Sequence, residues 1–82
     1  MKITHTITKS EIQNGLLVFR KSDMEKISRM NLSGSFDITI NNLKIESRNF
    51  MNYNKNRIWI GFDYMKNFQH KQNLEIEFQQ IT

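Results

Sequence analysis

The sequence predicts a small α+β domain, an open pseudobarrel of about six mostly antiparallel strands with two or three short helices. Its 82 residues leave room for one hydrophobic core, so we expect a single domain over residues 1–82. Several short segments alternate apolar and polar residues, as half-buried strands do. Between them stand short helix-capping signals rather than the regular strand-helix alternation of a parallel sheet.

The chain opens on a predicted strand followed by a turn of helix. Residues 2–8 alternate between apolar and polar side chains, which is the period of a half-buried strand. Thr8 and Glu11 then have the spacing of a capping box, which predicts a short helix over residues 10–13. Gly15 stands where such a helix needs a left-handed residue to end.

A strand and a second helix are predicted next. Residues 16–19 are apolar on both faces, as in a central strand. Residues 22–25 form a second capping-box pattern ahead of apolar residues at helical spacing. We therefore expect a helix over residues 23–30.

The second half of the chain predicts a hairpin, a further strand, a third helix and a last strand. Residues 36–45 alternate around an Asn-Asn pair that tolerates positive φ and so predicts a hairpin turn. Residues 58–62 have strand character, and Asp63 is placed to cap the third helix. Residues 74–78 alternate again, with their glutamates facing outward. The predicted order is strand, helix, strand, helix, three strands, helix and strand.

Composition limits the classes of function. The chain has 12 Lys and Arg against 8 Asp and Glu, and no cysteine. This excess of positive charge favours anionic partners, nucleic acid above all, and argues against an acidic mimic of DNA. The lack of cysteine excludes a disulfide framework and a Cys-based zinc site. No apolar run approaches the roughly 20 residues of a membrane span, and no signal-peptide stretch is visible, so we expect a cytoplasmic protein without membrane contact.

No catalytic or cofactor motif is recognisable in the sequence. His5 and His70 lie far apart, without a cysteine or carboxylate at metal-ligand spacing, so we expect no metal and no other cofactor. The chain also lacks a nucleophile elbow, a phosphate-cradling glycine loop and a His-Glu-x-x-His motif. We therefore expect a binding protein rather than an enzyme, with His5 a strand residue and His70 on the surface.

The most informative stretch is residues 47–57, where basic residues and amides replace the apolar rhythm and no acidic residue occurs. Lys and Arg neutralise phosphates, Asn pairs bidentately with adenine, and Arg pairs with guanine in the major groove of DNA. The candidate DNA-binding residues of this stretch are Arg48, Asn49, Asn52, Tyr53, Asn54, Lys55, Asn56 and Arg57. Because asparagine also favours turns, a plain surface loop is the competing interpretation.

A second basic region lies beside the predicted helix starts, where cations and backbone N–H groups together suit a phosphate. Its candidates are Lys9, Ser10, Arg20 and Lys21, with solvated surface charge as the alternative. Among the aromatic residues, Phe50 and Trp59 are expected to pack in the core. Tyr53 is left open between core packing and stacking on a base.

Two motifs precede the second predicted helix: residues 7–12 read Ile-Thr-Lys-Ser-Glu-Ile, and residues 15–21 read Gly-Leu-Leu-Val-Phe-Arg-Lys. Together with residues 45–50 and 57–62 and the order of elements, they resemble the B-three-type DNA-binding pseudobarrels of plant transcription factors. Relatives of that family in bacterial restriction endonucleases look similar as well. The chain departs from the pattern at Arg20, which replaces the usual proline, and in lacking the Gly-Asp that commonly precedes the last strand.

The resemblance spans nearly the whole chain and implies a reader of double-stranded DNA, free-standing or the targeting part of a restriction-modification or mobile-element system. In that family two arms enter or flank the major groove, which here are residues 9–14 with Arg20 and Lys21, and residues 47–57. One alternative is a small phage- or plasmid-type protein that inhibits a host nuclease or another protein through its basic loop. A single-strand binder is a third class, and it requires aromatics on an exposed strand face. Hydrophobic sheet edges are also compatible with a homodimer.

Overall fold

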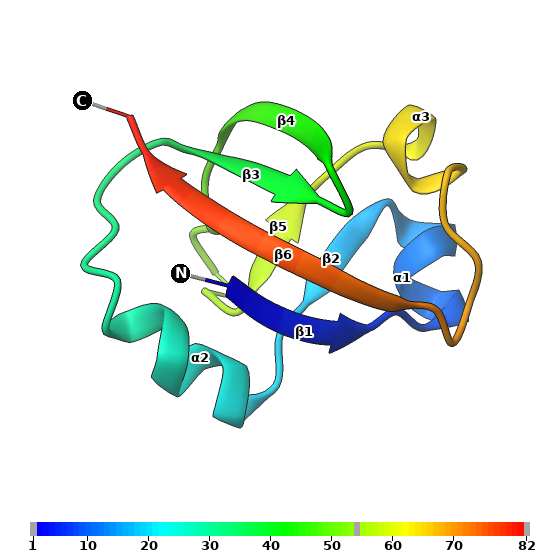
Figure 1. Cartoon of the computed structure of the whole chain (residues 1–82), viewed down its shortest axis with the longest axis horizontal. Coiled ribbons are helices and arrows are strands. Elements are labelled where there is room, and N and C mark those ends of the chain that lie inside the picture. The colour runs from blue at the N-terminus through cyan, green and yellow to red at the C-terminus, as the bar shows by residue number, and fades with distance from the viewer. Residues whose placement is uncertain (1, 54, 82) are drawn as a thin grey trace.

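The computed structural model describes residues 2–53 and 55–81. Over these residues the chain forms six strands and three helices in the predicted order, so the α+β class and the open pseudobarrel are confirmed (Figure 1). No helix of the described chain is long and apolar enough to cross a membrane. The elements are β1 (Lys2–Thr6), α1 (Lys9–Asn14), β2 (Leu16–Val18), α2 (Lys21–Ser28), β3 (Phe36–Ile40), β4 (Leu43–Arg48), β5 (Arg57–Trp59), α3 (Phe62–Met65) and β6 (Asn73–Gln80).

The strands form two open sheets. Four of them make an antiparallel sheet in the order β1-β6-β3-β4, and β2 pairs with β5 in a separate ribbon. The long strand β6 crosses the middle of the larger sheet, with β1 on one side and β3 on the other (Figure 1). Along β6, Leu74, Ile76 and Phe78 are buried while Glu75 and Glu77 are exposed, as their alternation predicted.

The hairpin between β3 and β4 turns at the Asn-Asn pair. Asn41 and Asn42 have φ values of 47° and 72°, which confirms the predicted left-handed turn. Asn41 also fastens this turn to β6, because its side-chain Oδ1 accepts a hydrogen bond of 2.8 Å from the backbone N–H of Glu75. The turn is therefore held by the neighbouring strand as well as by its own backbone preference.

The predicted capping box forms at the start of α1. The backbone N–H of Glu11 donates to Thr8 Oγ1 at 3.2 Å, and the backbone N–H of Thr8 donates to Glu11 Oε1 at 2.9 Å. Gly15 ends the helix at φ 71°, in the left-handed region that glycine tolerates. A Cβ at this position would lie 3.1 Å from the Trp59 ring, so any other residue would have to displace that ring as well as adopt the left-handed conformation.

The other two predicted helix starts are wrong. α2 begins at Lys21, before the second capping-box pattern, and its N-cap residue Arg20 makes no side-chain cap hydrogen bond. Asp23, a member of that pattern, is instead buried and directed toward His5. α3 begins at Phe62 after Gly61, so Asp63 lies inside the first turn and does not cap it. In both cases the observed start lies at a residue that the local pattern did not single out.

The ribbon of β2 and β5 contradicts two further predictions. Residues 16–19 do not form a central strand, because β2 pairs with β5 alone among the described strands. Leu17 and its partner Ile58 are fully buried, but the alternate residues face outward. Trp59, expected in the core, is therefore 47% exposed and lies against Gly15. A two-stranded ribbon buries one face only, so an apolar run along it leaves half of its side chains at the surface.

The core joins the two sheets through a cluster of aromatic rings. Phe19 lies within 6.3 Å of Phe50 and 6.0 Å of Phe78, measured between ring centroids. Phe36 lies 5.4 Å from Phe50 and 5.6 Å from Phe78. The predicted packing of Phe50 is thus confirmed, and its ring anchors the start of the amide-rich segment to the core.

Candidate nucleic-acid interface

A buried cluster of three ionisable side chains ties the basic regions to the core. His5, Glu11 and Asp23 are 4%, 3% and 8% exposed. His5 Nε2 lies 2.7 Å from Glu11 Oε2, and His5 Nδ1 lies 3.6 Å from Asp23 Oδ2. Glu11 Oε2 also accepts a hydrogen bond of 2.8 Å from the backbone N–H of Val18. The cluster thereby connects β1, α1, β2 and α2.

Sequence reasoning missed this cluster, although two local signals pointed inward. His5 takes an apolar position in the alternation of β1, and Glu11 belongs to a capping box that brings its side chain back toward the chain. The third member, Asp23, has no such signal, because only the packing of α2 beside β1 brings it to the histidine. Within the described chain, no group of three or more His, Cys, Asp or Glu side chains is arranged to hold a metal ion.

Hydrogen bonding shifts the pKa values of His5 and Glu11 in opposite directions. Burial by itself lowers the pKa of His5, but the hydrogen bond and charge of Glu11, and then those of Asp23, outweigh it and raise that pKa above 6.5. Burial likewise acts to raise the pKa of Glu11. Hydrogen bonds from His5 and from the backbone N–H groups of Val18 and Thr8 outweigh it and lower that pKa below 4.5. The cluster favours a protonated His5 against an ionised Glu11.

These shifts predict how stability depends on pH. A group whose pKa is raised by folding stabilises the fold below its ordinary pKa and loses that contribution as pH rises through the folded value. Glu11, with its lowered pKa, contributes above pH 4.5 and loses its contribution as pH falls. We therefore expect the urea midpoint to be highest between about pH 4.5 and 6.5 and to fall above pH 6.5, measured by circular dichroism.

The two histidines separate the causes of this pH dependence. His5→Gln should abolish the fall in midpoint above pH 6.5, whereas His70→Gln should leave it unchanged because His70 is exposed. A wild-type midpoint that stays constant or rises above pH 6.5 would contradict the assignment to His5.

The cluster borders a depression of about 360 Å³. Three candidate DNA-binding residues from separate segments line it: Ser10 on α1, Arg20 after β2, and Arg57 at the start of β5. The full lining is His5, Thr6, Thr8, Ser10, Glu11, Val18, Phe19, Arg20 and Arg57. The structure therefore joins one member of the amide-rich stretch to two members of the other basic region.

The pairing of β2 with β5 brings these segments together. Val18 lies opposite Arg57 in the ribbon, and the pairing continues one step beyond it. There the backbone N–H of Phe19 donates to the carbonyl of Asn56 at 2.8 Å, and Asn56 Nδ2 donates to the carbonyl of Phe19 at 3.1 Å. The side-chain amide of Asn56 is thus used to position its neighbour Arg57.

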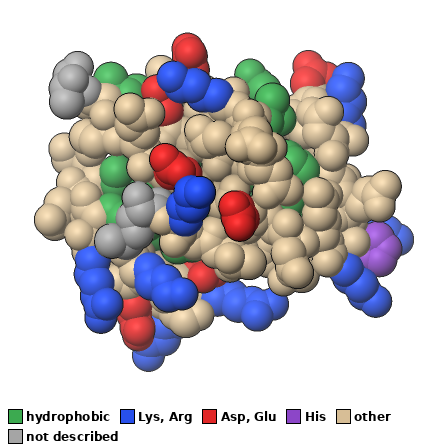
Figure 2. All heavy atoms as spheres, viewed as in Figure 1, with side chains coloured by type: hydrophobic (Ala, Val, Ile, Leu, Met, Phe, Trp, Pro, Cys, Tyr) green, Lys and Arg blue, Asp and Glu red, His purple; other side chains and the backbone are tan. Residues whose placement is uncertain are grey.

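The candidate cations have no carboxylate partner within the described chain. Lys2, Lys44 and Lys66 each have a carboxylate within 4.0 Å. None of the described carboxylates lies that close to the candidate cations, which are Lys9, Arg20, Lys21, Arg48, Lys55 and Arg57. The Nε atom of Arg57 is buried without a hydrogen-bond partner among these residues. Figure 2 shows Lys and Arg side chains gathered along the lower edge of the molecule, where Figure 1 places α2.

Arg48 and Lys9 do not join this group. Arg48 donates hydrogen bonds to the carbonyls of Glu46 at 2.9 Å and Ile60 at 3.2 Å, and its guanidinium carbon lies 5.7 Å from the centre of the Tyr64 ring. It therefore connects β4 to the chain after β5. Lys9 lines a different depression, of about 510 Å³, on the side of α1 that faces Phe68.

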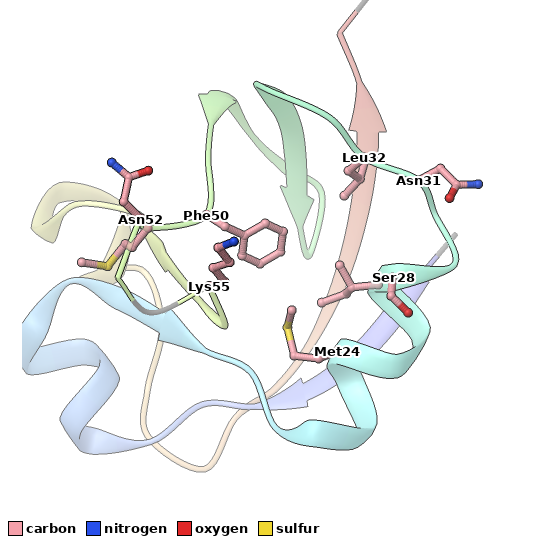
Figure 3. A pocket seen from close by; sticks show the side chains of 9 residues that line it. Met24, Ser28, Asn31, Leu32, Phe50, Asn52 and Lys55 are labelled. Atoms are coloured by element: carbon pink, nitrogen blue, oxygen red, sulfur yellow. The ribbon is translucent and has the colours of Figure 1, made fainter.

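The remaining candidates lie on the segment between Phe50 and Arg57. Asn49 and Asn52 are exposed, and Tyr53 is 98% exposed, which settles the open choice for Tyr53 against core packing. Asn52 and Lys55 line a groove beside α2 (Figure 3). The helix α2 also carries the exposed Lys21. Asn54 lies outside the described residues.

An exposed aromatic pair was also missed by sequence reasoning. Trp59 and Phe62 are 47% and 58% exposed, with ring centroids 5.4 Å apart at an angle of 87°. Both belong to a short apolar run that reads equally well as buried strand, so the sequence holds no signal for their exposure.

Comparison of the chain with protein-family models, curated proteins and solved structures finds no match. The resemblance to B-three-type pseudobarrels stays a prediction.

Proposed function

We propose that this chain is a non-enzymatic domain that binds double-stranded DNA and seats a backbone phosphate in the depression of Ser10, Arg20 and Arg57. One observation carries the proposal: these three donors come from separate segments and line a single depression, and neither arginine has a described carboxylate within 4.0 Å. Arginine presents a planar fork of donors that matches phosphate, and a hydroxyl adds a further donor. The proposal places the protein in the cytoplasm.

The nearby carboxylate of Glu11 does not compete for the arginines. It already accepts hydrogen bonds from His5, from the backbone N–H of Val18 and from that of Thr8.

A duplex suits the spread of the other exposed candidates. Lys21 and Lys55 lie close in the chain to Arg20 and Arg57 and are exposed, so they can reach further phosphates. Asn49, Asn52 and Tyr53 stand exposed on the segment that leads into β5, where base edges in a major groove are accessible to them. These residues would read sequence while the arginines set the position of the domain.

One observation favours single-stranded nucleic acid as a second candidate. Trp59 is an exposed strand residue paired edge-to-face with Phe62, and it stands two residues from Arg57 on the same strand. An aromatic ring beside a cation is the arrangement on which unstacked bases bind. The experiment below therefore includes a single strand.

The test is the salt dependence of binding to a labelled mixed-sequence duplex, followed by fluorescence anisotropy. Each neutralised phosphate contributes about −0.9 to the slope of log K against log salt concentration. Four cations that each contact a phosphate therefore give a slope of about −3.6. Oligo-dT of equal length is the comparison. No binding to duplex at low salt contradicts the proposal, and quenching of Trp59 fluorescence by oligo-dT without duplex binding selects the single-strand alternative.

A further inference from the structure

A second concave surface lies between α2 and the segment that follows β4. It is a groove of about 440 Å³, and Figure 3 shows Met24 and Ser28 of α2 across from Phe50 and Lys55, with Asn31 and Asn52 toward opposite ends. Its lining is Met24, Ile27, Ser28, Asn31, Leu32, Phe50, Met51, Asn52 and Lys55. It shares no lining residue with the depression of Ser10, Arg20 and Arg57.

The lining of this groove is mainly apolar and adaptable. Five of its nine side chains are apolar: Met24, Ile27, Leu32, Phe50 and Met51. Ile27 and Phe50 belong to or pack on the core, so the floor is held in place, while Met51 is 37% exposed at the surface. Methionine side chains adjust their shape to an incoming group, which is why they recur on surfaces that bind peptides.

The rim of the groove is positively charged. Lys55 is the one charged side chain of the lining, and the exposed Lys21 lies one helical turn before Met24, on the same side of α2. Neither lysine has a carboxylate of the described residues within 4.0 Å. The positive charge therefore favours an anionic partner, and the apolar floor of the groove favours an apolar group in contact with it.

We propose that this groove binds an acidic segment of a partner protein, which inserts one large apolar side chain between Phe50 and α2. A DNA duplex does not meet both demands, because its bases are stacked inside and its exposed phosphates gain nothing from an apolar floor. An acidic peptide with a single Phe, Leu, Met or Trp does, with its carboxylates near Lys55 and Lys21. The groove and its rim share Lys21, Lys55 and Asn52 with the proposed DNA contacts, but they do not involve the depression of Ser10, Arg20 and Arg57.

The experiment selects binding peptides from a random displayed library on the immobilised full chain and measures the affinity of the enriched peptides by calorimetry. We expect enriched peptides with net negative charge and one large apolar residue. Met51→Asp, which places a charge at the groove, should weaken them by about tenfold or more, as should Ala in place of the peptide's apolar residue. Lys55→Glu should reduce the preference for acidic peptides.

Two control variants distinguish binding at this groove from nonspecific peptide binding elsewhere on the protein. Trp59→Ala alters the other exposed apolar surface, and Arg57→Ala alters the depression, so both should retain peptide affinity. Met51 is exposed, and a thermal melt of each variant establishes that it folds. The inference is overturned if no peptide is enriched over the bare support, if the enriched peptides are basic or lack an apolar residue, or if Met51→Asp binds them as well as wild type does.

Discussion

Replacing Glu11 with alanine should lower the free energy of unfolding by about 3–5 kcal/mol, the usual effect of removing one partner from a buried charged pair. Glu11 is 3% exposed, and its carboxylate accepts hydrogen bonds from His5, from the backbone N–H of Val18 and from the backbone N–H of Thr8. The substitution leaves a buried histidine without its closest acceptor and removes the capping box of α1. Because small domains are stable by only about 5–15 kcal/mol, this is a large share of the total.

Urea unfolding followed by circular dichroism measures this loss, and Glu25→Ala is the matched control. Glu25 is an exposed carboxylate on α2 with no ion pair to the described residues, so its removal should change stability by no more than about 0.5 kcal/mol. Glu11→Gln keeps the size of the side chain and should cost less than Glu11→Ala. Equal effects of Glu11→Ala and Glu25→Ala would show that the buried cluster does not stabilise the fold.

Replacing Arg20 and Arg57 together with alanine should weaken duplex binding by about a hundredfold, since a hydrogen bond to a charged group contributes about 1.5–3 kcal/mol. Each arginine lost should also reduce the magnitude of the salt slope by about 0.9. The reason is the shared depression, in which we propose that both guanidinium groups and Ser10 bind one phosphate. Arg57→Ala alone should produce about a tenfold loss.

The control for this double variant removes the same amount of charge elsewhere. Lys2 and Lys44 lie on the larger sheet and are already paired, with Glu77 at 3.9 Å and Asp37 at 3.7 Å. Lys2→Ala with Lys44→Ala should therefore leave duplex affinity within about twofold of wild type, because paired surface charges add little. If both double variants lose affinity equally, net charge alone attracts the DNA and the depression is not its site.

Local patterns predicted the elements whose determinants lie close together in the chain. The capping box of Thr8 and Glu11, the Asn-Asn turn and the alternation of β6 each depend on residues a few positions apart, and each is confirmed. The second capping-box pattern and the cap at Asp63 failed for the opposite reason. Asp23 faces the distant His5, and α3 starts where Gly61 donates a backbone hydrogen bond of 2.9 Å to the carbonyl of Gly15.

In the candidate site, too, features that depend on nearby residues were predicted and features that depend on distant contacts were not. Sequence reasoning identified the cations and amides, but it did not foresee that Arg48 and Asn56 donate hydrogen bonds to backbone carbonyls. It placed Trp59 inside, although the ribbon of β2 and β5 leaves it half exposed. It passed over His5, whose two carboxylate neighbours come from two different helices.

By itself the sequence determined the class of the fold, the order of its elements and its excess of positive charge, because composition, short-range capping and alternation suffice for these. The tertiary structure decided which charges share a surface. Ser10, Arg20 and Arg57 meet because the ribbon pairs segments far apart in the chain, with Asn56 donating to Phe19 across 37 positions. Such pairing depends on how the whole core packs, and no local pattern of residues encodes it.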